Sequence, residues 1–183
     1  MKIAEENYII WDNESFTIEA KIDSNLWNIN LINDFQKNLH KVLYYIYKNS
    51  DITILDNKNL ISLYFSGDIK IIELNNLYRK INLPTNVLSF PSYSKYNNIL
   101  FLGDIIFSID TISREAKRDK KSFNNHLIHL FIHGVLHLLG YDHQTNTQAK
   151  KMENLEIGLL HMLNIDNLEC LLTNSTPLIM FPH

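Results

Sequence analysis

Apolar residues recur at helical spacing along several stretches of this chain. From Leu26 to Lys48 they return every three or four residues, which predicts a long amphipathic helix with one buried face. A second helix is expected over 68–79, with Asp68 as the capping residue at its start. A last helix is expected from Thr147 to Leu163.

Two more helices are predicted from the residues at their starts. Asp110 and Ser122 both have side-chain oxygens that accept hydrogen bonds from the first turn of a helix, as N-cap residues do. The helix after Ser122 enters an apolar segment and is expected to end near Gly140, because glycine commonly follows the last turn of a helix.

Three short runs rich in β-branched and aromatic residues predict strands. They are Ile61–Phe65, Val87–Phe90 and Leu100–Phe107. With one long helix before them and about five helices in all, they predict an α+β fold in which the helices pack on a small mixed sheet. Neither an internal repeat nor a Gly/Ser- or Pro-rich linker divides the chain, so we expect one domain over 1–171 and a loosely held tail over 172–183.

Composition and charge narrow the class of protein. The chain has 183 residues, 45% hydrophobic and 20% charged, with a net charge of −3, which fits one soluble domain and excludes a polybasic nucleic-acid binder. Its one cysteine, Cys170, has no partner for an internal disulfide, and Met1 to Glu6 lead into no secretory signal. The most apolar stretch, 127–139, is too short to cross a membrane. We therefore expect a cytoplasmic protein.

The segment from His133 to His143 carries the clearest chemistry. On a helix, His133 and His137 stand one turn apart on one face, which is the spacing that lets two imidazoles share a metal ion. If Gly140 then ends the helix in a left-handed conformation, the chain turns back and His143 offers a third nitrogen. Three protein ligands leave one position open for water, so the segment predicts a catalytic site for one zinc ion, with nickel and copper as alternatives.

The residues between these histidines bear on the reaction. The spacing equals that of the metzincin proteases, but their general-base glutamate is replaced by Gly134, which disfavours ordinary zinc proteolysis. A small residue here is expected to leave room for a bulkier substrate beside the ion. Asp142 is a candidate to orient one of the ligating imidazoles.

Other charged residues and histidines can be interpreted either as structural or as functional. From local sequence alone, Arg79 is better explained as a surface cation at a helix end than as a phosphate-binding group. The densest basic stretch comprises Arg114, Lys117, Arg118, Lys120 and Lys121. Such a stretch is typical of a solvated helix face, but next to a metal site it would attract an RNA backbone. The remaining histidines of this region are expected to be core residues; they are His126, His129 and His161.

Several motifs, in the same order, resemble those of the YbeY-type endoribonucleases, a family of bacterial rRNA maturation factors. The histidine motif with glycine at its second position is the most specific of them. The others are Leu74-Asn75 with Tyr78-Arg79, the string Pro84-Thr85-Asn86-Val87-Leu88-Ser89-Phe90-Pro91, and Leu102-Gly103-Asp104-Ile105. The resemblance covers roughly 60–163.

The resemblance implies a fold, a metal site and an activity. It implies a single α+β domain with one zinc ion bound by His133, His137 and His143, and it places the family's functional arginine on Arg79. The implied activity is metal-dependent cleavage of single-stranded RNA, in maturing the 3′ end of small-subunit (16S) rRNA and in ribosome quality control. The ribosomal small subunit or its associated proteins are the implied partners. Asn86 stands where many members carry aspartate, although members with asparagine occur.

Two alternatives remain open at this point. A metal-dependent peptidase or amidase would keep the three histidines but needs a base such as Asp142 or Glu153, and Arg79 would be dispensable. A non-catalytic ribosome assembly factor would use the metal only to staple the helix to the following loop, and it would need a fourth protein ligand, with Asp142 as the nearest candidate.

Overall fold

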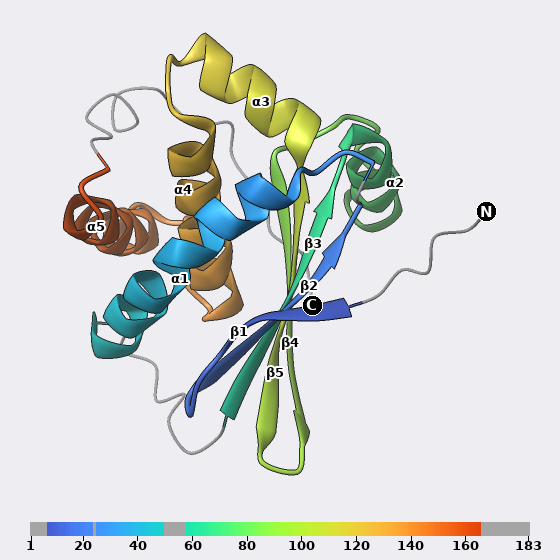
Figure 1. The fold of residues 1–183 in the computed structure, drawn as a ribbon. Coiled ribbons are helices and arrows are strands. Elements are labelled where there is room, and N and C mark those ends of the chain that lie inside the picture. The colour runs from blue at the N-terminus through green and yellow to red at the C-terminus, as the bar shows by residue number, and fades with distance from the viewer. Residues whose placement is uncertain (1–6, 24, 50–57, 166–183) are drawn as a thin grey trace.

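The computed structural model describes residues 7–23, 25–49 and 58–165, which form one mixed sheet with helices packed around it (Figure 1). The strands of these residues are β1 (Asn7–Asp12), β2 (Phe16–Ile22), β3 (Lys58–Ser66), β4 (Val87–Tyr96) and β5 (Ile99–Ser108). The helices are α1 (Ile29–Asn49), α2 (Asp68–Arg79), α3 (Ile109–Arg118), α4 (Phe123–Leu138) and α5 (Asn146–Met162).

The sheet combines parallel and antiparallel pairs. Its strand order is β1-β2-β3-β5-β4, so that β4 forms an edge. The pairs β1–β2 and β4–β5 are antiparallel hairpins, whereas β2–β3 and β3–β5 are parallel. The long connections between the parallel strands contain helices, as parallel pairing requires. The single α+β domain with a mixed sheet and about five helices is therefore confirmed.

The two faces of the sheet are covered by different helices. Ile61, Leu63 and Phe65 of β3 belong to the main core, which includes residues of α1 and α4. Tyr64 between them points the other way and joins a smaller cluster with Ile71 of α2. Helix α2 accordingly lies on the opposite side of the sheet from α1 and α4 (Figure 1).

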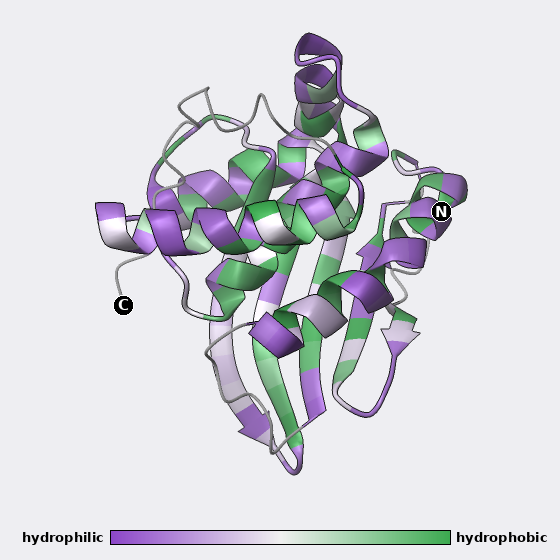
Figure 2. Cartoon of the chain, turned by 90° about the vertical axis from the view of Figure 1, so that its left-hand side faces the viewer, coloured by the Kyte–Doolittle hydropathy of each residue, from purple (hydrophilic) through white to green (hydrophobic). Residues whose placement is uncertain are grey.

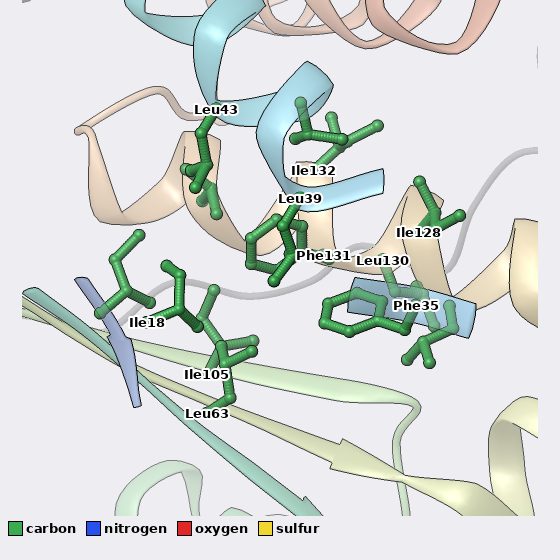
Figure 3. Close-up of a cluster of buried hydrophobic side chains, with 14 of the residues drawn as sticks. Ile18, Phe35, Leu39, Leu43, Leu63, Ile105, Ile128, Leu130, Phe131 and Ile132 are labelled. Carbon is green, nitrogen blue, oxygen red and sulfur yellow. The ribbon is translucent and has the colours of Figure 1, made fainter. Parts of the chain in front are cut away.

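Helix α4 runs through the centre of the main core. Its side chains interdigitate with those of α1 above the sheet, and Phe131 meets Phe35 edge to face at 5.2 Å between ring centroids (Figure 3). Eleven of the sixteen residues of α4 are buried and the other five are half-buried, which explains why its sequence is apolar nearly all round. The outer helices show polar colour on their exposed sides and apolar colour toward the sheet (Figure 2). Packing of this kind fixes the position of any site carried by α4.

Most predicted elements are confirmed, with shifts of a few residues at their ends. The helix expected over 26–48 is α1, that over 68–79 is α2, and that over 147–163 is α5. Ser122 does cap α4, since its hydroxyl accepts from the backbone N–H of Asn125. The three predicted strands lie within β3, β4 and β5.

The expectation that a long helix precedes the sheet was wrong, because the hairpin β1–β2 comes first. Phe16, Ile18 and Ala20 are buried and alternate with less buried neighbours, a strand pattern that the sequence contained. The turn before β2 is closed by Asn13, whose side-chain oxygen accepts from the backbone N–H groups of Ser15 and Phe16.

Two of the predicted caps were also wrong, since Asp68 and Asp110 each bind across to another helix. Gly67 is the N-cap of α2, and Ser108 is the N-cap of α3. The Asp68 carboxylate instead accepts hydrogen bonds from the hydroxyls of Ser108 and Thr111. Asp110 in turn accepts from the backbone N–H of Asp68 at 2.9 Å. The two aspartates therefore tie the starts of α2 and α3 together.

Two further expectations concern a membrane-spanning segment and the C-terminal tail. Among the described residues, the structure has no helix that is long and apolar enough to cross a membrane. The tail expected over 172–183, and Cys170 before it, lie outside the described residues.

Candidate metal centre

The end of α4 and the turn that follows it bring three histidines together. His133 and His137 lie one turn apart on the helix. Gly140 has a φ of +82°, in the left-handed region that favours glycine. The backbone N–H of Gly140 donates to the carbonyl of His137, and that of Tyr141 donates to the carbonyl of Leu136. This turn reverses the chain and brings His143 back to the helix, as the sequence predicted.

The three imidazoles converge on one point. One ring nitrogen of each histidine lies within 4.8 Å of the corresponding nitrogens of the other two. The Nε2 atoms of His133 and His137 are 3.0 Å apart. His137 is buried, whereas His133 and His143 are half-buried, so the cluster is reachable from solvent on one side. An open side suits a catalytic site better than a closed structural one.

The hydrogen bonds on the far side of two rings show which nitrogens face the cluster. Nδ1 of His133 lies 2.6 Å from a carboxylate oxygen of Glu156 in α5, and Nδ1 of His137 lies 3.1 Å from the backbone carbonyl of Tyr141. Both partners are acceptors, so each Nδ1 carries the proton and each Nε2 presents a lone pair. Two lone pairs facing each other at 3.0 Å repel unless a cation lies between them. The donor set therefore fits a metal ion that prefers imidazole nitrogen.

The electrostatics of the cluster keep two of its rings neutral, as metal ligands must be. Burial lowers the pKa of His137 to about 3, and the neighbouring His133 and His143 add to this shift. Burial also lowers the pKa of His143. For Glu156, burial acts to raise the pKa, but the neighbouring His129 and His133 outweigh it and the pKa is lowered. His137 and His143 are thus neutral, and the Glu156 carboxylate near them is ionised.

Glu156 is the functional candidate that sequence reasoning missed. It lies thirteen residues beyond His143 on the next helix, so no local spacing pointed to it. The two carboxylates that the sequence suggested, Asp142 and Glu153, have other surroundings. Asp142 is buried and accepts from the backbone N–H of His143, while Glu153 is exposed. Asp142 therefore braces the loop, and the metal-type cluster found among the described residues consists of the three histidines.

Gly134 has a different role from the one expected. A Cβ at this position would lie 3.0 Å from two side-chain carbons of Ile105 and 3.1 Å from the hydroxyl oxygen of Ser89. The absent side chain lets α4 pack closely on β4 and β5, so the space that Gly134 frees is taken up by the sheet and not left open as expected. The missing general-base glutamate still sets the site apart from that of the metzincins.

Arg79 lies on the opposite side of the sheet from α1 and α4. It is the last residue of α2, and the preceding Tyr78 packs edge to face on Phe90 of β4 at 5.0 Å between centroids. The Arg79 side chain is half-buried, and burial lowers its pKa from an ordinary value so high that the guanidinium stays charged. A partly desolvated cation at the end of α2 is suited to bind a phosphate, and this role remains a prediction.

The basic stretch on α3 is partly neutralised. Arg114 forms an ion pair with Asp68 at 2.8 Å, and Arg118 forms one with Asp119 at 2.6 Å. The lysines of this stretch, Lys117, Lys120 and Lys121, end α3 and the turn after it. Its contribution to RNA attraction also remains a prediction.

Of the three histidines expected in the core, two are at least half-buried and one is exposed. His126 is buried and lies 2.7 Å from the Glu115 carboxylate, and His129 is half-buried near Glu156, with 3.9 Å between the nearest atoms. His161 is exposed on α5, so its placement in the core was wrong.

Comparison with known proteins decides the family. Over residues 21–164 the sequence matches the family described as Endoribonuclease YbeY. The chain belongs to this family. The resemblance drawn from the sequence motifs is thereby confirmed, and the family acts in rRNA processing.

Relatives that carry the family name align over most of the chain. A protein named Endoribonuclease YbeY from Bartonella bacilliformis is 40% identical over 136 residues, which cover 69% of this chain and 86% of the relative. One from Bartonella quintana is 39% identical over 160 residues, covering 82% of this chain and 95% of the relative. A solution structure of a protein from Thermotoga maritima aligns with a TM-score of 0.48 and 20% identity, over 88% of this chain and 99% of that one.

The string Pro-Thr-Asn-Val-Leu-Ser-Phe-Pro, residues 84–91, has a structural explanation. Asn86 donates to the Glu115 carboxylate at 2.9 Å, and the same carboxylate oxygen lies 2.7 Å from the ring of His126. The Asn86 carbonyl also accepts from the backbone N–H of Ser108. The string thus anchors the start of β4 to α3 and α4, and it holds the strand that flanks the histidine cluster.

Proposed function

We propose that this chain is a metal-dependent endoribonuclease that cleaves single-stranded RNA in maturing the 3′ end of small-subunit rRNA and in ribosome quality control. The observation that carries the proposal is the convergence of three imidazole nitrogens within 4.8 Å at the end of a buried helix. Membership of the endoribonuclease family supports the choice of RNA as substrate. One cysteine in the whole chain suits a reducing compartment, so we place the reaction in the cytoplasm.

We assign one zinc ion to His133, His137 and His143. Imidazole nitrogen suits zinc, and three protein ligands are the number typical of a catalytic zinc site. When bound, zinc supplies Lewis acidity and lowers the pKa of water at its open position. Glu156 holds the His133 ring so that its Nε2 lone pair points into the cluster.

We assign a contact with the RNA backbone to a residue outside the histidine cluster. Arg79 is a half-buried cation, and its guanidinium is assigned to stabilise charge that develops on the phosphate. The net charge of −3 predicts weak affinity for free RNA, because few phosphate counterions would be released on binding. The ribosomal small subunit or its associated proteins would then bring substrate and enzyme together.

The test is cleavage of a single-stranded RNA that carries a small-subunit rRNA 3′ end. It compares the zinc-loaded chain, the chain in chelator, and the variants His133→Ala and Arg79→Ala. The exposed His161 and Lys41 supply controls, His161→Ala and Lys41→Ala, which remove a histidine and a surface cation away from the site and from the basic stretch on α3. Identical purification of all samples controls for contaminating nucleases.

We expect cleavage to be lost in chelator, in His133→Ala and in Arg79→Ala, and to persist in both controls. Equal cleavage by all preparations, or none even with ribosomal particles present, would contradict the nuclease and favour the metal-stapled assembly factor. Loss in His133→Ala with full activity in Arg79→Ala would exclude the proposed phosphate contact and leave the metal-dependent nuclease standing without it.

A further inference from the structure

The hairpin formed by β4 and β5 contains a local irregularity near the histidine cluster. Pro91 pairs with Gly103 and Ser94 pairs with Phe101, so two residues of β4 face a single residue of β5 between these pairs. One of the two is Tyr93, whose φ of +57° lies in the left-handed region. Tyrosine adopts this conformation at a cost, and such bulges often redirect a side chain beside an active site.

The redirected side chain reaches the turn that carries the candidate metal ligands. The hydroxyl oxygen of Tyr93 lies 3.6 Å from where a Cβ at Gly140 would stand. Gly140 is the residue at which the chain reverses between His137 and His143. A side chain from an edge strand, more than forty residues earlier in the sequence, therefore rests against the loop of the site.

The contact at the hydroxyl end leaves much of the ring uncovered. Tyr93 retains 50% of its full exposure. The burial at its other end raises the pKa of the phenol, so the group is neutral at physiological pH. An uncharged aromatic ring held at one end and open to solvent is a platform on which a nucleotide base can stack.

We propose that Tyr93 contacts the RNA substrate by stacking its ring on a base next to the three-histidine site. The inference rests on the proposed function, since it needs single-stranded RNA whose bases are unpaired. Stacking gives affinity with little dependence on sequence, which suits a chain whose net charge of −3 gives little overall attraction to RNA. It also explains why a strained backbone conformation is kept at an exposed strand position.

The chain offers a matched control on the same hairpin. Tyr96 lies three residues further along β4, is 78% exposed, and pairs in regular register with Ile99. Removing its ring changes the same kind of surface without touching the Gly140 turn. Tyr93→Phe keeps the ring and deletes only the hydroxyl.

Two measurements on the full chain separate binding from catalysis. Fluorescence anisotropy gives the Kd for a labelled single-stranded RNA oligonucleotide in chelator, where cleavage does not interfere. Steady-state cleavage of the same oligonucleotide by the zinc-loaded chain gives kcat and KM. Thermal unfolding of each variant checks that the fold is intact.

We expect Tyr93→Ala to raise Kd and KM by at least about fivefold, the low end of what one base stacked on an aromatic ring contributes, with kcat little changed. Tyr93→Phe should recover most of that loss, and Tyr96→Ala should match the wild type. If the wild type binds and cleaves the RNA but Tyr93→Ala is equal to it, the stacking role is wrong while the proposed function stands. If the wild type neither binds nor cleaves, both fall together.

Discussion

The carboxylate of Glu156 lies 2.6 Å from Nδ1 of His133 and holds a ring of the candidate metal centre in place. Glu156 comes from α5, whereas His133 lies on α4, so the contact joins two helices that pack side by side. An ionised carboxylate that accepts from Nδ1 fixes the tautomer of the ring and makes its Nε2 a better ligand. The metal site is thus built from two helices and a loop.

Replacing this carboxylate should weaken metal binding without removing a ligand. We expect Glu156→Gln to raise the Kd for zinc by about 10- to 100-fold, because the His133 ring loses its orienting charge. Competition with a chromophoric chelator measures the change. Glu153→Gln, at an exposed position on the same helix, is the control and should bind zinc like the wild type. Equal zinc affinity of Glu156→Gln and wild type would show that the carboxylate has no part in the site.

The stability of the metal-free protein should depend on pH through His137. The pKa of this ring is about 3 in the folded protein, mainly through burial, against an ordinary value of 6.5. Between these two values the unfolded chain binds a proton that the folded chain does not, so stability falls as the pH is lowered from 6.5. We expect a loss of about 1–2 kcal/mol between pH 6.5 and pH 5, a range above the titration of ordinary carboxylates.

Urea unfolding in chelator across this range measures the effect. His137→Asn is the comparison, because its amide can still donate to the Tyr141 carbonyl but does not titrate. The variant should show a flatter pH profile than the wild type. Profiles of equal slope would mean that another group carries the pH dependence.

The histidine motif could be predicted from the sequence because its geometry is local. Helical spacing sets His133 and His137 on one face, and Gly140 reverses the chain within a few residues. Residues far apart in the sequence gave no such signal. Glu156 reaches His133 only through the packing of α5, and Tyr93 reaches the Gly140 turn only through the β4–β5 hairpin.

The predicted caps were wrong for the same reason, because contacts between distant segments decided them. Asp68 and Asp110 are typical N-cap residues, and each stands in the first turn of a helix. Tertiary packing places the two helix starts side by side, and the carboxylates bind across to the neighbour instead of to their own backbone. Local preference identified where helices begin, and it could not show which partner each side chain takes.

The Asp68 carboxylate should contribute measurably to stability. It accepts from the hydroxyls of Ser108 and Thr111 and from Arg114, so its removal leaves buried hydroxyls without their acceptor. We expect Asp68→Ala to lower the free energy of unfolding by about 1–3 kcal/mol. Asp119→Ala, which breaks only the surface pair with Arg118, should cost about 1 kcal/mol or less. Urea unfolding of both variants tests this, and equal losses would contradict the central position given to Asp68.

Gly103 should be the least replaceable glycine of the sheet. Its φ is +140°, and a Cβ would lie 2.1 Å from the carbonyl oxygen of Phe90, an atom of the paired strand that cannot move alone. Gly103→Ala must therefore separate β4 from β5, and we expect a loss of about 3 kcal/mol or more in the free energy of unfolding. Gly140→Ala is the comparison, because its Cβ would meet only the Tyr93 hydroxyl at 3.6 Å, so the left-handed backbone alone should cost about 1–2 kcal/mol. Urea unfolding ranks the two, and a smaller loss for Gly103→Ala than for Gly140→Ala would mean that the hairpin yields easily beside the histidine cluster.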